Sequence, residues 1–447
     1  MKLKTSLSLK SPLRSGFHIA DVLYITVLLV FFRPANYIIG GMVYKLLSLF
    51  LILVAGALAV YALFSSACRL VLQSKRYYAP SFPVLMLVLL FVWCMFCSSA
   101  INLVRGNPVD ANPALLYTAT GVGMTLLSDI GLTKRPKKYL RHFMLVGSLM
   151  CMLNNLTIFV FKSSGGFRGD TTSSRGFGLA DKTNFYLLAE DNASFFWAWP
   201  VLIAVWCYYY LFDRSKKMKR WALFYTAATA GAYLYAWSLM AMFCFLATVG
   251  LLYISRHYIG RKKKRKLRLV GFVSGFNVMV FAALFVNYLI SVVQIASYFS
   301  YYLETYLHKS ANLSGRVGIW NKAIRWIQTS KLIGFGNEAK AYSEYKLGIN
   351  HTHNLLLETM YRGGLIGIVI LLVMLFALGM RGKKVESQPL YKFLAYSMTL
   401  FILFCSFEFA FYRYPFVIVL VLIAHTELFQ EKSRLLQALN RRDLTHI

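Results

Sequence analysis

Long apolar segments recur along almost the whole chain, and they limit its fold more than any other feature. A helix needs about 17–25 predominantly apolar residues to cross a bilayer. Twelve segments approach or reach this length, and they lie at residues 19–32, 43–67, 81–104, 113–132, 142–161, 193–212, 221–237, 239–255, 269–290, 353–380, 392–411 and 414–430. Spanning β-barrels alternate apolar and polar residues, which these segments do not. The sequence therefore predicts an all-α polytopic membrane protein with about 12 transmembrane helices.

Basic residues dominate the charge of the chain, which is formally +32 at pH 7. Nucleic-acid binding is one interpretation of such a charge, but no basic motif here is interleaved with aromatic residues. Membrane topology explains the charge better, because cytoplasmic loops carry an excess of Lys and Arg. If the N-terminus is cytoplasmic, the segments on the inner side hold 33 of the 49 Lys and Arg residues. We therefore expect both termini in the cytoplasm, contact with anionic lipid, and no nucleic-acid partner.

Two of the connecting segments are long, although most loops of this single transmembrane domain (1–447) are short. Residues 162–192 form one predicted extracytoplasmic loop, and residues 291–352 form a larger one between the ninth and tenth helices. The larger loop contains an amphipathic helix near 316–330. Its apolar stripe consists of Trp320, Ala323, Ile324 and Ile327. A stripe with tryptophan and a basic opposite face is typical of a helix at a membrane surface, so we expect this loop to form a lid over the bundle.

The stretch "NHTHNLLLETMYRGGLIG", residues 350–367, places polar groups in an apolar setting. Asn354, Glu358 and Arg362 are four residues apart and share one helical face. Glutamate four residues before arginine is the favourable order for an ion pair. Ionisable groups inside a membrane segment are candidates for function, although a buried polar lock between helices explains this pair equally well.

Two histidines open the same stretch. His353 lies at the outer mouth of the predicted helix, and an imidazole there can accept a proton from a hydroxyl nucleophile. His351 is either a second binding group or a loop residue. The H-x-H spacing also suggests a metal, but no third ligand is evident from the sequence, so we expect no metal site.

Four arginines in the two long loops are candidates for binding phosphate: Arg168, Arg175, Arg316 and Arg325. The planar guanidinium stays charged and matches phosphate oxygens with two parallel hydrogen bonds. The alternative is a charge that faces solvent or lipid headgroups. Glu408 lies near the outer end of the eleventh helix, where a carboxylate needs a partner or water. An outer arginine is the partner that we expect.

Several common signatures are missing from the chain. There is no P-loop, dinucleotide-binding fingerprint, HExxH or GxSxG motif, and no outer acidic pair that would hold a metal on a sugar nucleotide. The seven cysteines fall in or beside the predicted helices and indicate no disulfide framework. The first apolar segment lacks a convincing cleavage site, so we expect it to be retained. The remaining candidates are arginines and histidines on the outer side, and they favour a phosphate-bearing substrate that arrives from the lipid phase.

Three stretches of the larger outer loop and the following helix, "SGRVGIWNKAI", "KLIGFG" and "HTHNLLLETMYRGGLIG", carry a recognisable pattern. An outer-loop arginine and a tryptophan precede a G-x-G, which is followed by His-Asn at the start of a helix with a Gly-rich turn. This pattern resembles the signature of the O-antigen ligase and O-antigen polymerase superfamily. The matching residues are Arg316, Trp320, Gly334, Gly336, His353 and Asn354. The segment from Arg175 to Asn184 resembles another arginine-bearing segment of the family, and the twelve-helix layout is similar too.

The resemblance implies a metal-independent glycosyltransferase without cofactors in the bacterial cytoplasmic (inner) membrane. Its donor would be an oligosaccharide repeat unit on undecaprenyl diphosphate, used at the outer face of the membrane. His353 would be the base for an acceptor hydroxyl, while Arg175 and Arg316 would stabilise charge on the leaving diphosphate. Asn354 and Glu358 would orient groups around the base. A chain-length regulator protein is a candidate partner.

The chain departs from the family where the eighth helix begins. Members often have Ser-Arg there, whereas Leu239 follows Ser238 in this chain, so an arginine contact is missing or comes from elsewhere. Polymerases and ligases share a donor and differ in acceptor, which is another lipid-linked repeat or a lipid A core. We favour a polymerase because the outer loop is modest in size and rich in tyrosine. A transporter of lipid-linked oligosaccharide is an alternative of another class, and a structural scaffold would leave His353 and the arginines without a purpose.

Overall fold

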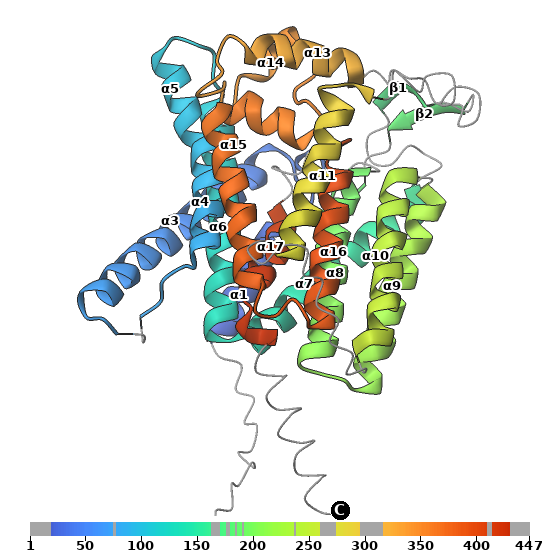
Figure 1. Ribbon diagram of the computed structural model, residues 1–447. Helices are drawn as coiled ribbons and strands as arrows, with labels where there is room; N and C mark the ends of the chain where they lie inside the picture. The colour runs from blue at the N-terminus through green and yellow to red at the C-terminus, as the bar shows by residue number, and fades with distance from the viewer. Residues whose placement is uncertain are drawn as a thin grey trace, which may run out of the picture.

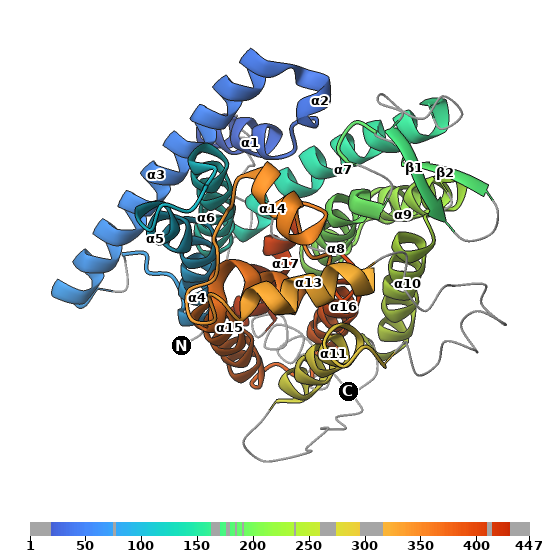
Figure 2. The same cartoon turned by 90° about the horizontal axis from the view of Figure 1, so that it is seen from above.

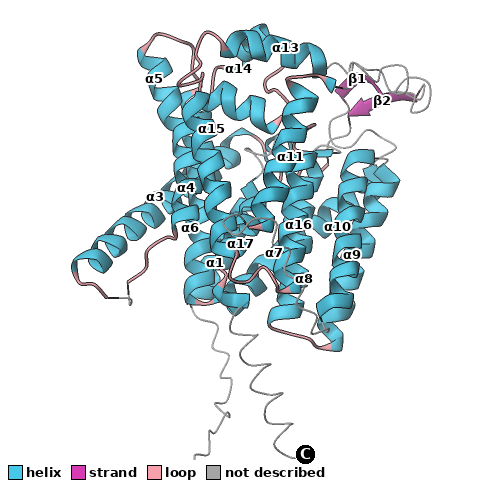
Figure 3. Cartoon of the chain, viewed as in Figure 1, coloured by secondary structure: helices cyan, strands magenta, loops and turns pink. Residues whose placement is uncertain are grey.

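A bundle of helices forms the body of the protein, and shorter helices lie across one end of it (Figure 1, Figure 3). The computed structural model describes residues 19–74, 77–161, 170–175, 179–183, 186–189, 192–236, 238–259, 274–295, 316–408 and 414–429. The end covered by α13 (Arg316–Ile327) and α14 (Lys340–Leu347) is called the capped end below.

Each of the twelve predicted apolar segments contains a helix. These helices are α1 (Ile19–Phe31), α3 (Gly41–Val71), α4 (Phe82–Phe91), α6 (Ala111–Lys134), α7 (Pro136–Phe161), α8 (Phe195–Leu211), α9 (Lys216–Ala236), α10 (Leu239–Ile259), α11 (Gly275–Ser291), α15 (Leu355–Gly382), α16 (Pro389–Phe404) and α17 (Val417–Ala424). A π-helix, η1 (Val92–Cys97), joins α4 to α5 (Ser98–Val104). The short elements are α2 (Asn36–Ile39), η3 (Asn192–Ser194) and η5 (Tyr414–Phe416).

Membrane-spanning character is evident from the length and surface of these helices. Within the described residues, five are long and apolar enough to cross a membrane, namely α3, the continuous α4–η1–α5 unit, α6, α7 and α15. Helix α3 leans out from the bundle (Figure 1) and exposes large apolar side chains such as Leu53 and Leu63. Lipid is the solvent that such side chains favour. The protein is thus a polytopic α-helical membrane protein, while the number of twelve spans and the orientation of the termini stay predictions.

The centre of the bundle is packed around α8, which is apolar on every side. A helix of this kind belongs in the interior, and nearly all of its residues are buried. Trp199 stacks on Phe401 of α16 with ring centroids 4.5 Å apart. Phe195 packs on Phe404, one turn further along α16, with centroids 4.6 Å apart. These contacts fix the end of α16 from which the chain continues into residues 405–408.

A separate apolar cluster attaches the cap, formed by α13 and α14, to the bundle. Trp320, Ala323 and Ile327 of α13 are buried against Leu357 and Tyr361 of α15. Figure 2 shows α13 and α14 lying across the bundle when it is viewed from above. The interpretation of this stripe as a membrane-surface contact is therefore wrong, because the stripe packs on protein.

A two-stranded antiparallel hairpin lies beside the capped end (Figure 1). Strand β1 (Asp170–Arg175) pairs with β2 (Leu179–Thr183). The all-α prediction missed this hairpin. Its strands, "DTTSSR" and "LADKT", are largely polar, so they lack the apolar alternation by which strands are recognised in a sequence.

Helix α15 is broken at Gly364, whose φ of 59° lies in the left-handed region. In Figure 1 its first part crosses the bundle beneath α13 and α14, and its second part descends along the bundle. The break brings the backbone against the loop that precedes α14. The amide of Phe335 donates to Tyr361 O over 2.7 Å, and that of Leu365 donates to Lys331 O over 2.8 Å. The expected span 353–380 is thus two helical pieces, and glycine is needed on both sides of the contact, because a Cβ at Gly364 would clash with Leu332 and one at Gly334 with Arg362.

Candidate active site

His353 lies between the cap and the first turn of α15. Its φ of 52° places a non-glycine residue in the left-handed region, a strained conformation that persists only where its surroundings enforce it. Its Nδ1 lies 3.1 Å from Oε1 of Glu408, which follows α16. The backbone therefore holds the imidazole against a carboxylate that is 55 positions away in the sequence.

His351 joins the same group. Its Nε2 is 3.7 Å from Oε1 of Glu408, and its ring centroid is 4.0 Å from that of His353. Nδ1 of His351 is 2.5 Å from Oδ1 of Asn350. The three side chains are partly exposed, at 15% for Glu408, 19% for His353 and 21% for His351. Within the described part of the chain, this is the group of donor atoms close enough to share a metal ion.

Electrostatics favours an ionised carboxylate in this group. Burial raises the pKa of the Glu408 carboxyl, but the charge of His353 and hydrogen bonds from both imidazoles outweigh burial and hold this pKa well below its usual range. Burial and the neighbouring His353 lower the pKa of His351 below its usual value. At neutral pH the group therefore contains a carboxylate and a neutral His351. The pairing of Glu408 with two histidines was not predicted from the sequence, which suggested an outer arginine.

Asn354 fixes the position of His353. Its Oδ1 accepts from the amide of Leu357 over 3.0 Å and caps α15, while its Nδ2 donates to Ser406 O over 3.2 Å. The amide of Leu355 also donates to Cys405 O over 2.8 Å. These bonds connect the start of α15 to the segment that ends in Glu408. Asn354 thus positions the start of α15 in the described structure, and a contact of Asn354 with substrate stays a prediction.

Glu358 and Arg362 form the predicted ion pair, with Nε and Oε1 2.5 Å apart, and both are buried. Glu358 also accepts from the amide of Thr352 over 2.6 Å. Arg362 donates to Oδ1 of Asn337 over 2.8 Å and to Gly336 O over 3.3 Å. The pair therefore connects two loops to α15, the histidine loop (residues 350–353) and the glycine loop (residues 334–337). This favours the interpretation of the pair as a buried polar lock.

The predicted phosphate-binding arginines are only partly described. Arg316 is the first residue of α13 and is partly buried, whereas Arg325 in its last turn is exposed. Arg316 is one turn before Trp320, whose Nε1 donates to Thr352 O over 2.9 Å, so both belong to the face of α13 turned toward the histidine loop. Arg175 ends β1, with its side chain not described, and Arg168 lies outside the described residues.

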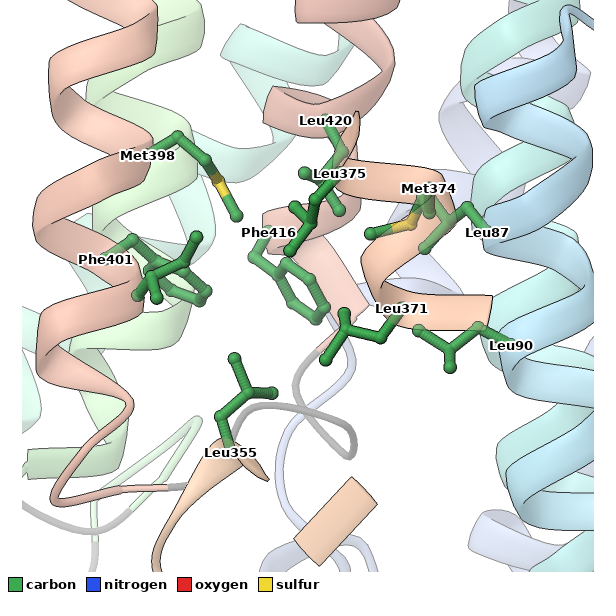
Figure 4. Close-up of a pocket in the computed structure, with 11 residues that line it drawn as sticks. Leu87, Leu90, Leu355, Leu371, Met374, Leu375, Met398, Phe401, Phe416 and Leu420 are labelled. Carbon is green, nitrogen blue, oxygen red and sulfur yellow. The ribbon is translucent and has the colours of Figure 1, made fainter. Parts of the chain in front are cut away.

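An apolar cavity lies next to the start of α15, between α4, α15, α16 and α17 (Figure 4). Leu355, the residue after Asn354, is part of its wall together with Met374, Met398 and Phe401. Its volume of about 30 Å³ has room for one or two water-sized groups. The two flexible methionines can change its shape.

Comparison with known families bears on this site. Residues 224–372 match the family model described as O-Antigen ligase. This match, over about a third of the chain, supports the resemblance to the O-antigen ligase and polymerase superfamily. A search of curated proteins finds no matching relative. The region similar to O-antigen ligases runs from α9 into α15 and includes Arg316 and His353, whereas Glu408 lies beyond it. An activity of the O-antigen ligase or polymerase type is therefore supported, as is a membrane glycosyltransferase in general.

Proposed function

We propose that the protein polymerises oligosaccharide repeat units carried on undecaprenyl diphosphate, at the capped end and on the outer face of the cytoplasmic membrane. The observation that carries the proposal is the hydrogen bond between Nδ1 of His353 and the Glu408 carboxylate. It occurs in a chain whose residues 224–372 match the O-antigen ligase family. A carboxylate on Nδ1 sets the tautomer of the imidazole and leaves Nε2 as the basic nitrogen.

The proposed reaction is a displacement at the anomeric carbon. Nε2 of His353 removes the proton of an acceptor sugar hydroxyl, and the hydroxyl oxygen forms a bond to the anomeric carbon. The bond between that carbon and the diphosphate oxygen breaks, and undecaprenyl diphosphate leaves with the electron pair. Attack on the face opposite the leaving group inverts the anomeric configuration. The Glu408 carboxylate stabilises the imidazolium that forms on His353.

Cationic side chains would bind the departing diphosphate. Arg316, on the α13 face turned toward the histidine loop, is the best supported of these. Arg175 is its proposed counterpart from the hairpin, with Arg168 and Arg325 as further contacts. Guanidinium groups held in place before the reaction stabilise the growing charge without a metal ion.

Replacing Arg316 with lysine should lower the rate of chain extension by a factor on the order of 10², because a fixed donor to the developing charge is lost. An ammonium keeps the charge but cannot reproduce the two parallel hydrogen bonds of guanidinium. The rate is measured with purified protein and lipid-linked repeat units. Lys322→Ala is the control, since it removes a cation from the exposed face of the same helix. Wild-type rates for Arg316→Lys would argue against a phosphate contact.

Replacing Glu408 with glutamine should lower kcat by a factor on the order of 10², because the amide does not stabilise a protonated His353. KM should stay near its original value, since Glu408 acts through His353 and not on the substrate. Glu408→Asp should recover part of the rate, which a purely structural defect would not explain. Glu427→Gln is the matched control, because that glutamate forms an exposed ion pair with Arg381. A change in KM alone would oppose the positioning role.

Reconstitution in liposomes separates the proposed reaction from its alternatives. With lipid-linked repeat units as the sole substrate, a ladder of longer glycans is the expected product. Products that form only when a lipid A core is supplied would identify a ligase. Movement of the lipid-linked substrate between leaflets without any new glycosidic bond would identify a transporter.

A further inference from the structure

We propose that His351, His353 and Glu408 form a binding site for one divalent transition-metal ion of the Zn²⁺ class, and that the bound ion inhibits the protein. The inhibitory part rests on the proposed function, whereas the metal site does not. Two imidazoles and one carboxylate form a familiar zinc ligand set, with a fourth position left for water.

The distances between the donor atoms already approach those of a tetrahedral site. With bonds of about 2.0–2.1 Å to zinc, ligand atoms lie about 3.3 Å apart. Oε1 of Glu408 is 3.1 Å from Nδ1 of His353 and 3.7 Å from Nε2 of His351. All three donor atoms lie within 4.8 Å of one another. Small side-chain rotations would therefore complete the site, with no movement of the backbone.

The surroundings also prepare His351 as a ligand. Its Nδ1 faces Oδ1 of Asn350 at 2.5 Å, which favours the tautomer with the proton on Nδ1. With a metal ion bound, this tautomer would leave the lone pair of Nε2 for the ion, next to the Glu408 carboxylate. A hydrogen bond to the second ring nitrogen is the usual support of a histidine ligand.

Metal binding and the proposed base catalysis exclude each other. A metal on Nδ1 of His353 leaves the proton of the neutral imidazole on Nε2, so Nε2 cannot accept the proton of an acceptor hydroxyl. The same ion also occupies the carboxylate that would stabilise the imidazolium. Zinc bound here should therefore stop the transfer reaction, and a chelator should restore it.

The test is a titration of purified protein with Zn²⁺, in competition with a chelating dye, and with Co²⁺ as a spectroscopic probe. We expect one ion per chain and the visible bands of four-coordinate Co²⁺. His351→Gln should weaken binding at least about tenfold, since a ligand contributes no less than the outer groups that support it. His351→Cys should retain binding because a thiolate is also a zinc ligand, and this variant separates ligand loss from misfolding.

His425→Gln is the matched control. His425 also contacts a carboxylate, with Nε2 2.7 Å from Oδ1 of Asp129, but it belongs to no cluster of three donors among the described residues. Absence of saturable binding, equal affinity in His351→Gln, or equal loss in His425→Gln would overturn the site. The titration needs no substrate, so failure of the proposed function would leave its result interpretable. If zinc binds and chain extension continues unchanged, the inhibitory part is wrong.

Discussion

Replacing His353 with alanine should lower the rate of glycan chain extension by a factor of about 10²–10⁴, the usual contribution of a general base. The variant should still bind lipid-linked repeat units, because the predicted diphosphate contacts come from other residues. The measurement is product formation by purified protein in liposomes, with the amount of folded protein matched to the parent.

His425→Ala provides the control for this prediction, since it removes another histidine that contacts a carboxylate. Its rate should stay near that of the parent. A folded His353→Ala protein with parental activity would remove His353 from the mechanism. The contact of Glu408 with the two histidines, and any inhibition by zinc, would then need a different explanation.

Replacing Arg362 with methionine should destabilise the protein by about 3–5 kcal/mol, because it leaves Glu358 charged, buried and without its ion-pair partner. The ion pair is buried and supports Thr352 and Asn337 through further hydrogen bonds. The measurement is thermal or denaturant unfolding in detergent. Replacing both partners, with Glu358→Gln added, should recover part of the loss, since no unpaired charge remains.

Lys340 and Glu344 offer a matched comparison at the same i, i+4 spacing. Their side chains are 71% and 47% exposed, and their charged atoms are 3.6 Å apart. Lys340→Met should change stability by about 0.5 kcal/mol or less, because water screens exposed pairs. Similar small effects for Arg362→Met and Lys340→Met would show that the buried pair does not hold the cap to α15.

Much of the fold follows from one simple pattern, the length of the apolar segments. Each predicted segment contains a helix, as expected for apolar segments whose backbone must satisfy its own hydrogen bonds away from water. The break in α15 was not predicted. Gly363 and Gly367, on either side of the break, both lie against Cys94, where a glycine allows close packing. The turn at Gly364 depends on hydrogen bonds to residues 331–335, which no local pattern can reveal.

The candidate site was predictable residue by residue but not as a group. His351, His353 and Glu408 each stood out as polar groups in apolar surroundings. Their association depends on how α15 and α16 pack, over a separation of 55 positions between His353 and Glu408. The stripe around Trp320 illustrates the same limit, because an apolar helix face looks alike whether lipid or protein covers it.

The most direct test of the central claim is a structure of the protein with undecaprenyl diphosphate bound. The account predicts the diphosphate at the capped end, within ion-pair distance of Arg316 and beside the imidazole of His353. The lipid tail should lie between helices of the bundle. A diphosphate bound at the opposite end, or one at the capped end but away from both side chains, would contradict the account.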